Sequence, residues 1–484
     1  MTDKIGASIG RVFVFLCLVG LFGVTLHLAE AFARTLNVPT QYTTVQSAFD
    51  AAQPGDIILL APGTYNEKTE TKRGGTANAR IIIDGQNAAT LKKITLRHPY
   101  ITIQKMRFAG MPVSHEGYVH LHHYAHYTIV QDCIIDLGYQ KSTNAIRWEV
   151  TRIPPFGKGE VASHCLITRN DISHAKASYI ISMAGDYNAF TYNYVHDVIQ
   201  ADFIGLFGRY NYIGYNTFSN NIQEGGLGWH SDFIQTFGNN CHGSQHHIIE
   251  NNYIYKLIGG GMAQISGSMV PEISDWTFRN NIFHEAGTLM SITIPNVHIF
   301  NNLFYQNNKI GNNASGPLSF GSRYFPAGGN GCRGKEGTTY AHGAKVFNNI
   351  FLDNGCCDRT NAGWYAFAPE LKDVAADYNY VGKSIHGVPY SPVNKNPKEK
   401  TVGDPGGWDV WKWWEPHGFN GGDPKFVNIA AGCEGDKSCN FHLQKGSMLI
   451  DSGLDLSAVW PDAKSQDGVS RPQGDQWDIG PFEY

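Results

Sequence analysis

Charged side chains are scarce in this sequence: Asp, Glu, Lys and Arg together make up only 17% of its 484 residues. The formal net charge is −4, with 38 basic and 42 acidic residues and no basic stripe. Domains that bind nucleic acid normally carry clustered Lys and Arg, so we expect no nucleic-acid partner. Any attraction to an acidic polymer must therefore come from a local group of residues.

Long apolar runs are also missing, except near the N-terminus. Lys4 and Arg11 precede an apolar stretch over residues 12–28, and Ala31-Phe32-Ala33 supplies small residues for cleavage. This arrangement is typical of a secretory signal peptide, and the run is short for a membrane span. We predict that residues 1–33 are a signal peptide and that the mature chain is secreted, to an extracellular or periplasmic location. We expect no membrane span after cleavage.

Cysteine pairs with the C-x-x-C spacing of structural zinc sites are absent. Nine cysteines occur, and eight remain once Cys17 is removed with the signal. An even number in an oxidising compartment permits disulfides. The expected pairs are Cys433 with Cys439 and Cys332 with Cys356 or Cys357, while Cys133 and Cys165 are expected as buried thiols.

The sequence is rich in turn formers, with 54 Gly and a recurring asparagine. An Asn that leads into a short apolar or aromatic stretch occurs at positions 170, 193, 216, 252, 281, 302, 349 and 379. The successive intervals are 23, 23, 36, 29, 21, 47 and 30 residues. The short intervals match one minimal coil of a β-solenoid, and the longer ones match a coil with an inserted loop.

These repeats predict an all-β fold, a single-stranded right-handed parallel β-helix over residues 34–484. One coil cannot bury its own apolar face, so neighbouring coils must stack about 4.8 Å apart. A turn Asn repeated in register can adopt the left-handed conformation and pass amide hydrogen bonds from coil to coil. We therefore interpret these asparagines as structural.

Two stretches depart from the repeat and are predicted to be long loop insertions, residues 305–345 and 383–425. The second contains four tryptophans, among them Trp411 and Trp413. Loops of this length are usually functional. The tryptophan rings could stack on sugar rings of a bound polysaccharide, or they could pack the loop against the wall of the solenoid.

The two ends of the mature chain agree with this fold. Residues 42–65, YTTVQSAFDAAQPGDIILLAPGTY, predict a short amphipathic helix that covers the open end of the solenoid, followed by a strand. Residues 423–428, DPKFVN, and the terminal RPQGDQWDIGPFEY form a closing segment. In these features the sequence resembles the pectin-lyase-like β-helix superfamily over nearly the whole mature chain. That superfamily includes lyases, hydrolases, epimerases, esterases and adhesins, so the resemblance implies a fold rather than a reaction.

Two consecutive coils align without a gap, and the alignment places Asp202 opposite Asp232 and Gln235 opposite Gln264 of the coil after. Two carboxylates about 5 Å apart repel by roughly 3 kcal/mol at an effective dielectric constant near 20. Such a pair has three possible uses. It could bind Ca²⁺ together with Glu224, serve as acid and nucleophile of a retaining glycosidase, or cap turns by accepting backbone hydrogen bonds.

Other titratable residues gather near these coils. His230 precedes the second Asp, and Arg209 follows the first aligned segment. Earlier coils carry Arg147 and the histidine-rich run YVHLHHYAHY, in which alternation turns His120 and His122 to the same face. A row of His, Arg and Asp along one face is suited to binding a polymer.

The first hypothesis is an enzyme that cleaves an acidic, uronate-containing polysaccharide by β-elimination. In that reaction a cation neutralises the uronate carboxylate, a base removes the C5 proton and an acid assists the leaving oxygen. Arg147 and Arg209 are candidates for the cation, His230 is the preferred base, and Asp232 orients groups or binds metal. No complete catalytic motif of a lyase family is present. The alternatives are a glycoside hydrolase that uses the Asp pair and a non-catalytic carbohydrate-binding or adhesin-type surface protein.

Overall fold

The computed structural model describes residues 33–112, 116–149, 161–176, 179–222, 224, 231–236, 243–257, 262–266, 273–287, 290–307, 317–325, 337–354, 365–367, 373–382, 415–430, 433 and 438–484. The chain divides into two units, Met1–Phe32 and Ala33–Tyr484, and the fold is that of the second unit. Nearly all of the predicted signal peptide lies outside the described residues. Within the described ranges, no helix combines the length and the apolar character needed to span a bilayer.

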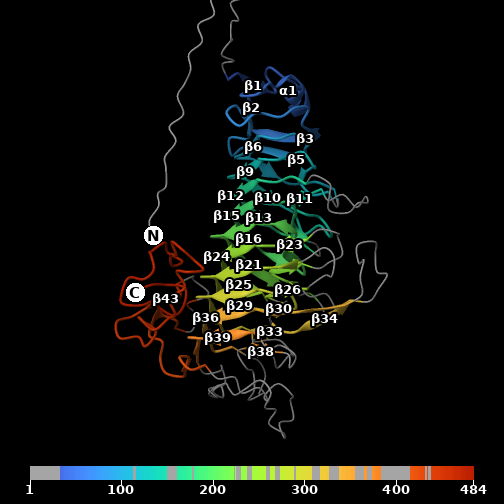
Figure 1. The fold of residues 1–484 in the computed structure, drawn as a ribbon. Helices are drawn as coiled ribbons and strands as arrows, with labels where there is room; N and C mark the ends of the chain where they lie inside the picture. Colours follow the sequence, from blue (N-terminus) through green and yellow to red (C-terminus); the bar gives the residue numbers. More distant parts are fainter. Residues whose placement is uncertain are drawn as a thin grey trace, which may run out of the picture. The chain divides into compact units, whose positions relative to one another are not determined.

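Each coil contributes short strands to three parallel stacks, and the strands lie one above another in chain order (Figure 1). The first stack is a 13-stranded sheet. It consists of β1 (Thr35–Val38), β2 (Ile57–Leu60), β4 (Ile81–Asp84), β6 (Ile101–Gln104), β9 (Ile129–Gln131), β12 (Leu166–Thr168), β15 (Ala189–Thr191), β20 (Tyr212–Gly214), β24 (Ile248–Glu250), β28 (Thr277–Arg279), β31 (His298–Phe300), β36 (Lys345–Phe347) and β39 (Ala375–Asp377).

The second and third stacks join in a 23-stranded sheet, because some strands bend across both. The second stack consists of β3 (Gly63–Glu70), β5 (Ala89–Leu96), β7 (Arg107–Phe108), β10 (Ile134–Asp136), β13 (Asp171–Ser173), β16 (Tyr194–His196), β17 (Val198–Ile199), β21 (Thr217–Ile222), β25 (Tyr253–Leu257), β29 (Ile282–Ala286), β32 (Leu303–Tyr305), β37 (Ile350–Leu352), β40 (Tyr380–Val381) and β41 (Phe419–Asn420). The third stack consists of β8 (Val119–Leu121), β11 (Ile146–Trp148), β14 (Tyr179–Met183), β18 (Asp202–Leu206), β22 (Ile234–Thr236), β26 (Ala263–Ile265), β30 (Met290–Ile292), β33 (Leu318–Phe320) and β38 (Tyr365–Phe367). The chain is therefore a parallel β-helix, which confirms the predicted fold class.

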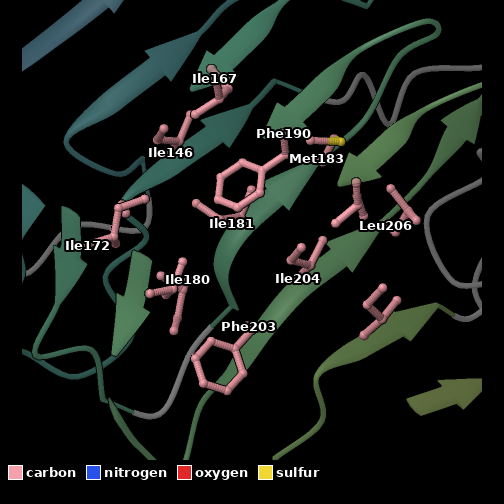
Figure 2. Close-up of a cluster of buried hydrophobic side chains, with 14 of the residues drawn as sticks. Ile146, Ile167, Ile172, Ile180, Ile181, Met183, Phe190, Phe203, Ile204 and Leu206 are labelled. Carbon is pink, nitrogen blue, oxygen red and sulfur yellow. The ribbon is translucent and has the colours of Figure 1, made fainter. Parts of the chain in front are cut away.

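The core is built from like side chains that stack in register. Ile146, Ile181, Ile204 and Ile234 occupy equivalent positions on four successive coils and are fully buried. Figure 2 shows the first three of them packed with Phe190 inside the coils. Burial of each such side chain stabilises the fold by about 2–3 kcal/mol, and the contacts continue from coil to coil without interruption.

The recurring asparagines form a continuous buried ladder. From Asn170 to Asn349, each side-chain amide donates to the Oδ1 of the next ladder Asn at 2.9–3.0 Å. The same Oδ1 accepts the backbone N–H of the preceding ladder Asn, and the series ends where Asn379 donates to Glu415. The predicted passing of amide hydrogen bonds from coil to coil is confirmed.

The left-handed backbone conformation belongs to a different residue from the one expected. Positive φ occurs at the residue before each ladder Asn, for example 54° at Arg169, 59° at Tyr215 and 58° at Asn348. The preceding residue turns the chain, which leaves the Asn backbone N–H aligned with the ladder. The expected position was therefore wrong by one residue.

The N-terminal end of the solenoid is covered by a helix, and the C-terminal segment packs along the side of the coils. The helix α1 (Val45–Ala51) buries Val45, Ala48 and Phe49, and a capping box between Thr44 and Ser47 begins it. At the other end, residues 438–484 run back alongside the coils (Figure 1), where Asn301 donates to the carbonyl oxygens of Asp478 and Gly480.

Several minor elements form small sheets outside the three stacks. A three-stranded parallel sheet contains β19 (Gly208–Arg209), β23 (Ser244–Gln245) and β27 (Ile273–Ser274), and two antiparallel pairs join β34 (Ser322–Phe325) with β35 (Gly337–Tyr340) and β42 (Phe426–Asn428) with β43 (Asn440–Leu443). The stretch 305–345, expected to be a loop, therefore contains the pair β34–β35 as well as β33 of the third stack. Most of the stretch 383–425 lies outside the described residues.

The structure describes some of the cysteines for which a disulfide or a free thiol was predicted. Cys433 and Cys439 form a disulfide, and Cys133 and Cys165 are buried free thiols, as expected. Burial raises the pKa of each free thiol to about 12, so both stay protonated at neutral pH. Cys332, Cys356 and Cys357 lie outside the described residues.

Candidate functional site

The third stack carries a line of outward-facing residues that we call the polar row. Parallel pairing places one residue per coil in register, so these side chains follow each other along the solenoid. The polar row consists of Thr95, His120, Arg147, Ser182, Gly205, Gln235, Gln264, Ser291 and Ser319. The structure thus brings together four residues that the sequence analysis singled out: His120, Arg147, Gln235 and Gln264.

The N-terminal part of the polar row is dense in charge. His120 is only 5% exposed, and its Nε2 lies 2.5 Å from Glu149 Oε2. Lys93, also buried, pairs with Glu116. Burial lowers the pKa of His120, and Lys93 lowers it further, against the opposite effect of the two glutamates. At neutral pH the imidazole is therefore neutral and able to accept a proton.

Tyr179 is a member of the site that the sequence analysis missed. Its hydroxyl donates to Gln235 Oε1, and Gln235 Nε2 donates in turn to Gln264 Oε1 at 2.8 Å. The ring passes over Gly205, where an added Cβ would lie 2.9 Å from a ring carbon. Burial raises the pKa of Tyr179, and the charges of Asp202 and Asp232 raise it further, so the phenol keeps its proton.

A signal for this residue was present in the aligned coils. Gly205 stands where the next two coils have Gln235 and Gln264. A glycine at one position of an otherwise polar row indicates that another group needs the space. The sequence alone could not name Tyr179 as that group, because it lies one coil away and three residues from the register position.

Asp202 and Asp232 occupy neighbouring coils at one edge of the polar row. The backbone N–H of Asp232 donates to Asp202 Oδ1 at 2.7 Å, and the N–H of Phe203 donates to the carbonyl of Asp232 at 2.9 Å. Gln235 Nε2 approaches Asp232 Oδ2 to 3.4 Å. The bond to Asp202 is the kind of turn-capping contact that the structural interpretation of this pair requires.

Two predicted residues are engaged elsewhere. Arg209 lies in the separate three-stranded sheet, and its Nη2 pairs with Asp186 at 2.7 Å. Glu224 pairs with Lys176 Nζ at 2.6 Å. Arg209 is therefore not part of the polar row, and Glu224 as a ligand of Ca²⁺ beside the Asp pair stays a prediction.

Three further predicted residues are His230, Trp411 and Trp413, which lie outside the described residues. Their roles as base and as sugar-stacking rings remain predictions. His122 follows β8 directly, with its ring centroid 6.3 Å from that of His120. Together with His123 and Glu149 it forms a group of three potential metal ligands.

A cavity of about 690 Å³ lies on another side of the molecule. Its walls come from the second stack and from the segment 438–484, and include Tyr194, Tyr253, Tyr255, His442 and Phe482. The sequence pattern does not predict this cavity, because its two walls are separated by some two hundred residues of chain.

Comparison with known proteins supports the fold. No protein-family model matches this chain, and no curated protein matches it. Among solved structures, XylC in complex with xylose is similar at 11% identity over 93% of this chain and 98% of its own, with a TM-score of 0.50. The PL6 polysaccharide lyase Pedsa3628 from Pseudopedobacter saltans covers 86% of this chain and 97% of its own at 12% identity and a TM-score of 0.49. Pectate lyase Pel9A covers 93% and 96% at 12% identity and a TM-score of 0.43.

At such low identities the likeness establishes the architecture alone. Together with the three parallel stacks and the asparagine ladder, it defines a parallel β-helix, the fold that the resemblance implied.

Proposed function

We propose that this protein is a secreted polysaccharide lyase that cleaves a uronate-containing polymer by β-elimination, with the polar row as its substrate-binding surface. The observation that carries the proposal is the position of Arg147. It lies in register between His120 on the preceding coil and Ser182 on the next, so a cation stands beside a neutral imidazole. β-Elimination needs this combination, because the C5 proton becomes acidic only when the adjacent carboxylate is neutralised.

The chain's own residues supply each part of the reaction. The Arg147 guanidinium pairs with the uronate carboxylate and stabilises the negative charge that develops on it. His120 takes the C5 proton on Nδ1, since its Nε2 faces Glu149, which stabilises the resulting imidazolium. The C5–H electron pair forms the C4–C5 double bond, and the C4–O bond breaks. The Tyr179 hydroxyl, which donates to Gln235 Oε1 in the free protein, turns to the departing oxygen and donates a hydrogen bond to it, and that oxygen leaves with a proton taken from water.

The base has a second candidate in His230, which the sequence predicts for this role. Variants separate the two candidates. If His120 is the base, His120→Ala abolishes turnover and His230→Ala retains it. If His230 is the base, the two variants give the opposite results. Ca²⁺ dependence is tested in the same assay with and without a chelator. Loss of activity on chelation, with recovery when Ca²⁺ is added back, would support a bound Ca²⁺ that neutralises the uronate carboxylate together with Arg147.

The decisive experiment incubates the purified protein with a panel of uronate polymers and follows the ultraviolet absorbance of the new C4–C5 double bond. Arg147→Ala should lower kcat/KM by about 100-fold or more, as removal of one charge-stabilising donor does in other enzymes. Arg107→Ala is the matched control, because this half-exposed arginine pairs with Asp136 on the second stack.

Either of two results would overturn the proposal: no absorbance change from the wild-type protein on any polymer, or full activity in Arg147→Ala. New reducing ends without a double bond would indicate a glycoside hydrolase, and Asp202→Asn and Asp232→Asn would then test the Asp pair. Binding without any cleavage would indicate a carbohydrate-binding surface protein.

A further inference from the structure

We infer that His122, His123 and Glu149 form a binding site for one divalent transition-metal ion of the zinc type. One ligand atom from each of the three side chains lies within 4.8 Å of the other two. Over the part of the chain that the structure describes, no other group of three or more His, Cys, Asp or Glu side chains meets this geometry. The site is separate from the cation site expected at Asp202 and Asp232, and the inference is independent of the proposed reaction.

The backbone holds the three residues in place. His122 and His123 directly follow β8, and Glu149 directly follows β11 on the next coil. The N–H of Glu149 donates to the carbonyl of Leu121 at 2.7 Å, and the N–H of His122 donates to the carbonyl of Leu96 at 2.8 Å. Both strand ends are thus fixed by the parallel ladder, so the side chains start from a preorganised frame.

The ring nitrogens supply the second, independent observation. The Nδ1 atoms of His122 and His123 are both buried, and neither has a hydrogen-bond partner among the described residues. A buried polar atom without a partner is unfavourable, so two adjacent ones call for an explanation. A metal ion accepts the lone pair of each nitrogen and removes this cost.

The donor set selects the kind of metal. Two imidazoles and one carboxylate suit Zn²⁺ and its neighbours, whereas Ca²⁺ requires six to eight oxygen ligands. Ligands about 2 Å from a tetrahedral zinc lie about 3.4 Å apart, so small side-chain rotations bring the three atoms onto one ion. Three protein ligands leave the fourth position open to water or to another ligand.

The charges around the group are compatible with a cation. Arg97 is a positive charge that acts on His122, and it is paired with Glu70 at 2.6 Å. Glu149 also contacts His120, but a carboxylate has two oxygens and can serve both. A bound ion would therefore hold Glu149 in place and position His120 near the N-terminal end of the polar row.

The test uses full-length mature protein without a histidine tag, stripped of metal with a chelator and dialysed. Calorimetric titration with Zn²⁺ should show one site per chain. His122→Ala and Glu149→Gln should each weaken the affinity by about 100-fold or more, since loss of even an indirect partner of a metal costs 10–100-fold. His164→Ala is the matched control, because this exposed histidine lies in a turn on another side of the coil and should bind like the wild type.

A second measurement does not depend on any variant. Co²⁺ added to the wild-type protein should give the intense visible absorption of a tetrahedral N/O site, and Zn²⁺ but not Ca²⁺ should abolish it. Absence of a stoichiometric Zn²⁺ site, or equal affinity in the wild type and both folded variants, would overturn the inference. Displacement by Ca²⁺ would overturn the choice of metal.

Discussion

Each ladder asparagine satisfies polar groups on three coils at once. Asn216 accepts from the backbone and side chain of Asn193, and its amide donates to Phe190, Gly214 and Asn252. An amide is the side chain that supplies one acceptor and two donors in a flat group of this size. Asn is therefore the residue type whose buried side chain satisfies all of these backbone and side-chain groups. This requirement explains why Asn recurs at the same position of each coil.

We expect Asn216→Ala to destabilise the protein by about 3 kcal/mol or more. The substitution leaves a buried N–H of Asn193, the Oδ1 of Asn252 and the carbonyl of Phe190 short of partners, at about 1–3 kcal/mol for each unsatisfied group. Urea unfolding monitored by circular dichroism measures the change. Asn66→Ala, an exposed position of β3, is the control and should differ from wild type by less than about 0.5 kcal/mol. Equal stability of the two variants would contradict this account of the ladder.

Among the site residues, the polar row illustrates what residue patterns can predict. His120, Arg147, Gln235 and Gln264 could be identified because strand alternation and coil alignment put like positions in register. Tyr179 could not, since its hydroxyl reaches Gln235 two coils away by crossing a glycine.

At the scale of the element, α1 depends on one capping arrangement. The Thr44 side chain accepts from the N–H of Ser47 at 3.0 Å, and the Ser47 hydroxyl accepts from the N–H of Thr44 at 3.2 Å. Glu67 on β3 accepts from the next two free amides, those of Val45 and Gln46. The helix therefore begins with its amides satisfied, and its buried face covers the first coil.

Thr44→Ala should destabilise the N-terminal end by about 1 kcal/mol, the usual cost of losing such a cap. Because a solenoid opens from its ends, we expect faster amide exchange in α1 and β1 with little change in later coils. Hydrogen exchange resolved by mass spectrometry measures this difference. Thr43→Ala, an exposed neighbour, provides the comparison, and uniform acceleration along the whole solenoid would argue against local opening.

At the scale of the whole molecule, the C-terminal segment is joined to coils far away in sequence. Arg471 and Glu483 form a fully buried ion pair, and the Arg471 guanidinium also donates to the Asn280 side chain. Breaking such a pair by removing one partner is expensive because a charge is left buried. The segment is thus a part of the fold rather than an appended tail.

The buried carboxyl of Asp478 makes the packing of the C-terminal segment against the coils sensitive to pH. Burial, and to a lesser extent the negative charge of Glu483, raises its pKa to about 6. An acid whose folded pKa is raised contributes stability that is present below its unfolded pKa, near 4, and is lost as the pH rises through about 6. The shift of about two pKa units corresponds to at most about 3 kcal/mol.

Asp478→Asn should therefore lack this fall in stability between about pH 4 and pH 6. Other carboxyls, such as Asp56 and Asp136, have lowered pKa values and act in the opposite direction, so the quantity to compare is the difference between variant and wild type. Urea unfolding at a series of pH values gives that difference. A difference that does not change with pH would contradict the assignment.

The sequence by itself determined the parallel β-helix, the capping helix, the Cys433–Cys439 disulfide and the amide ladder. Each of these follows from a short-range or periodic pattern of residues. The period is visible in the sequence because every coil places the same residue types in the same environment. Only the tertiary structure decided that Tyr179 spans the polar row, that His122, His123 and Glu149 converge, and that residues 438–484 close a cavity against the second stack. These contacts join positions at irregular separations, and their geometry depends on side-chain reach across coils, which no repeat encodes.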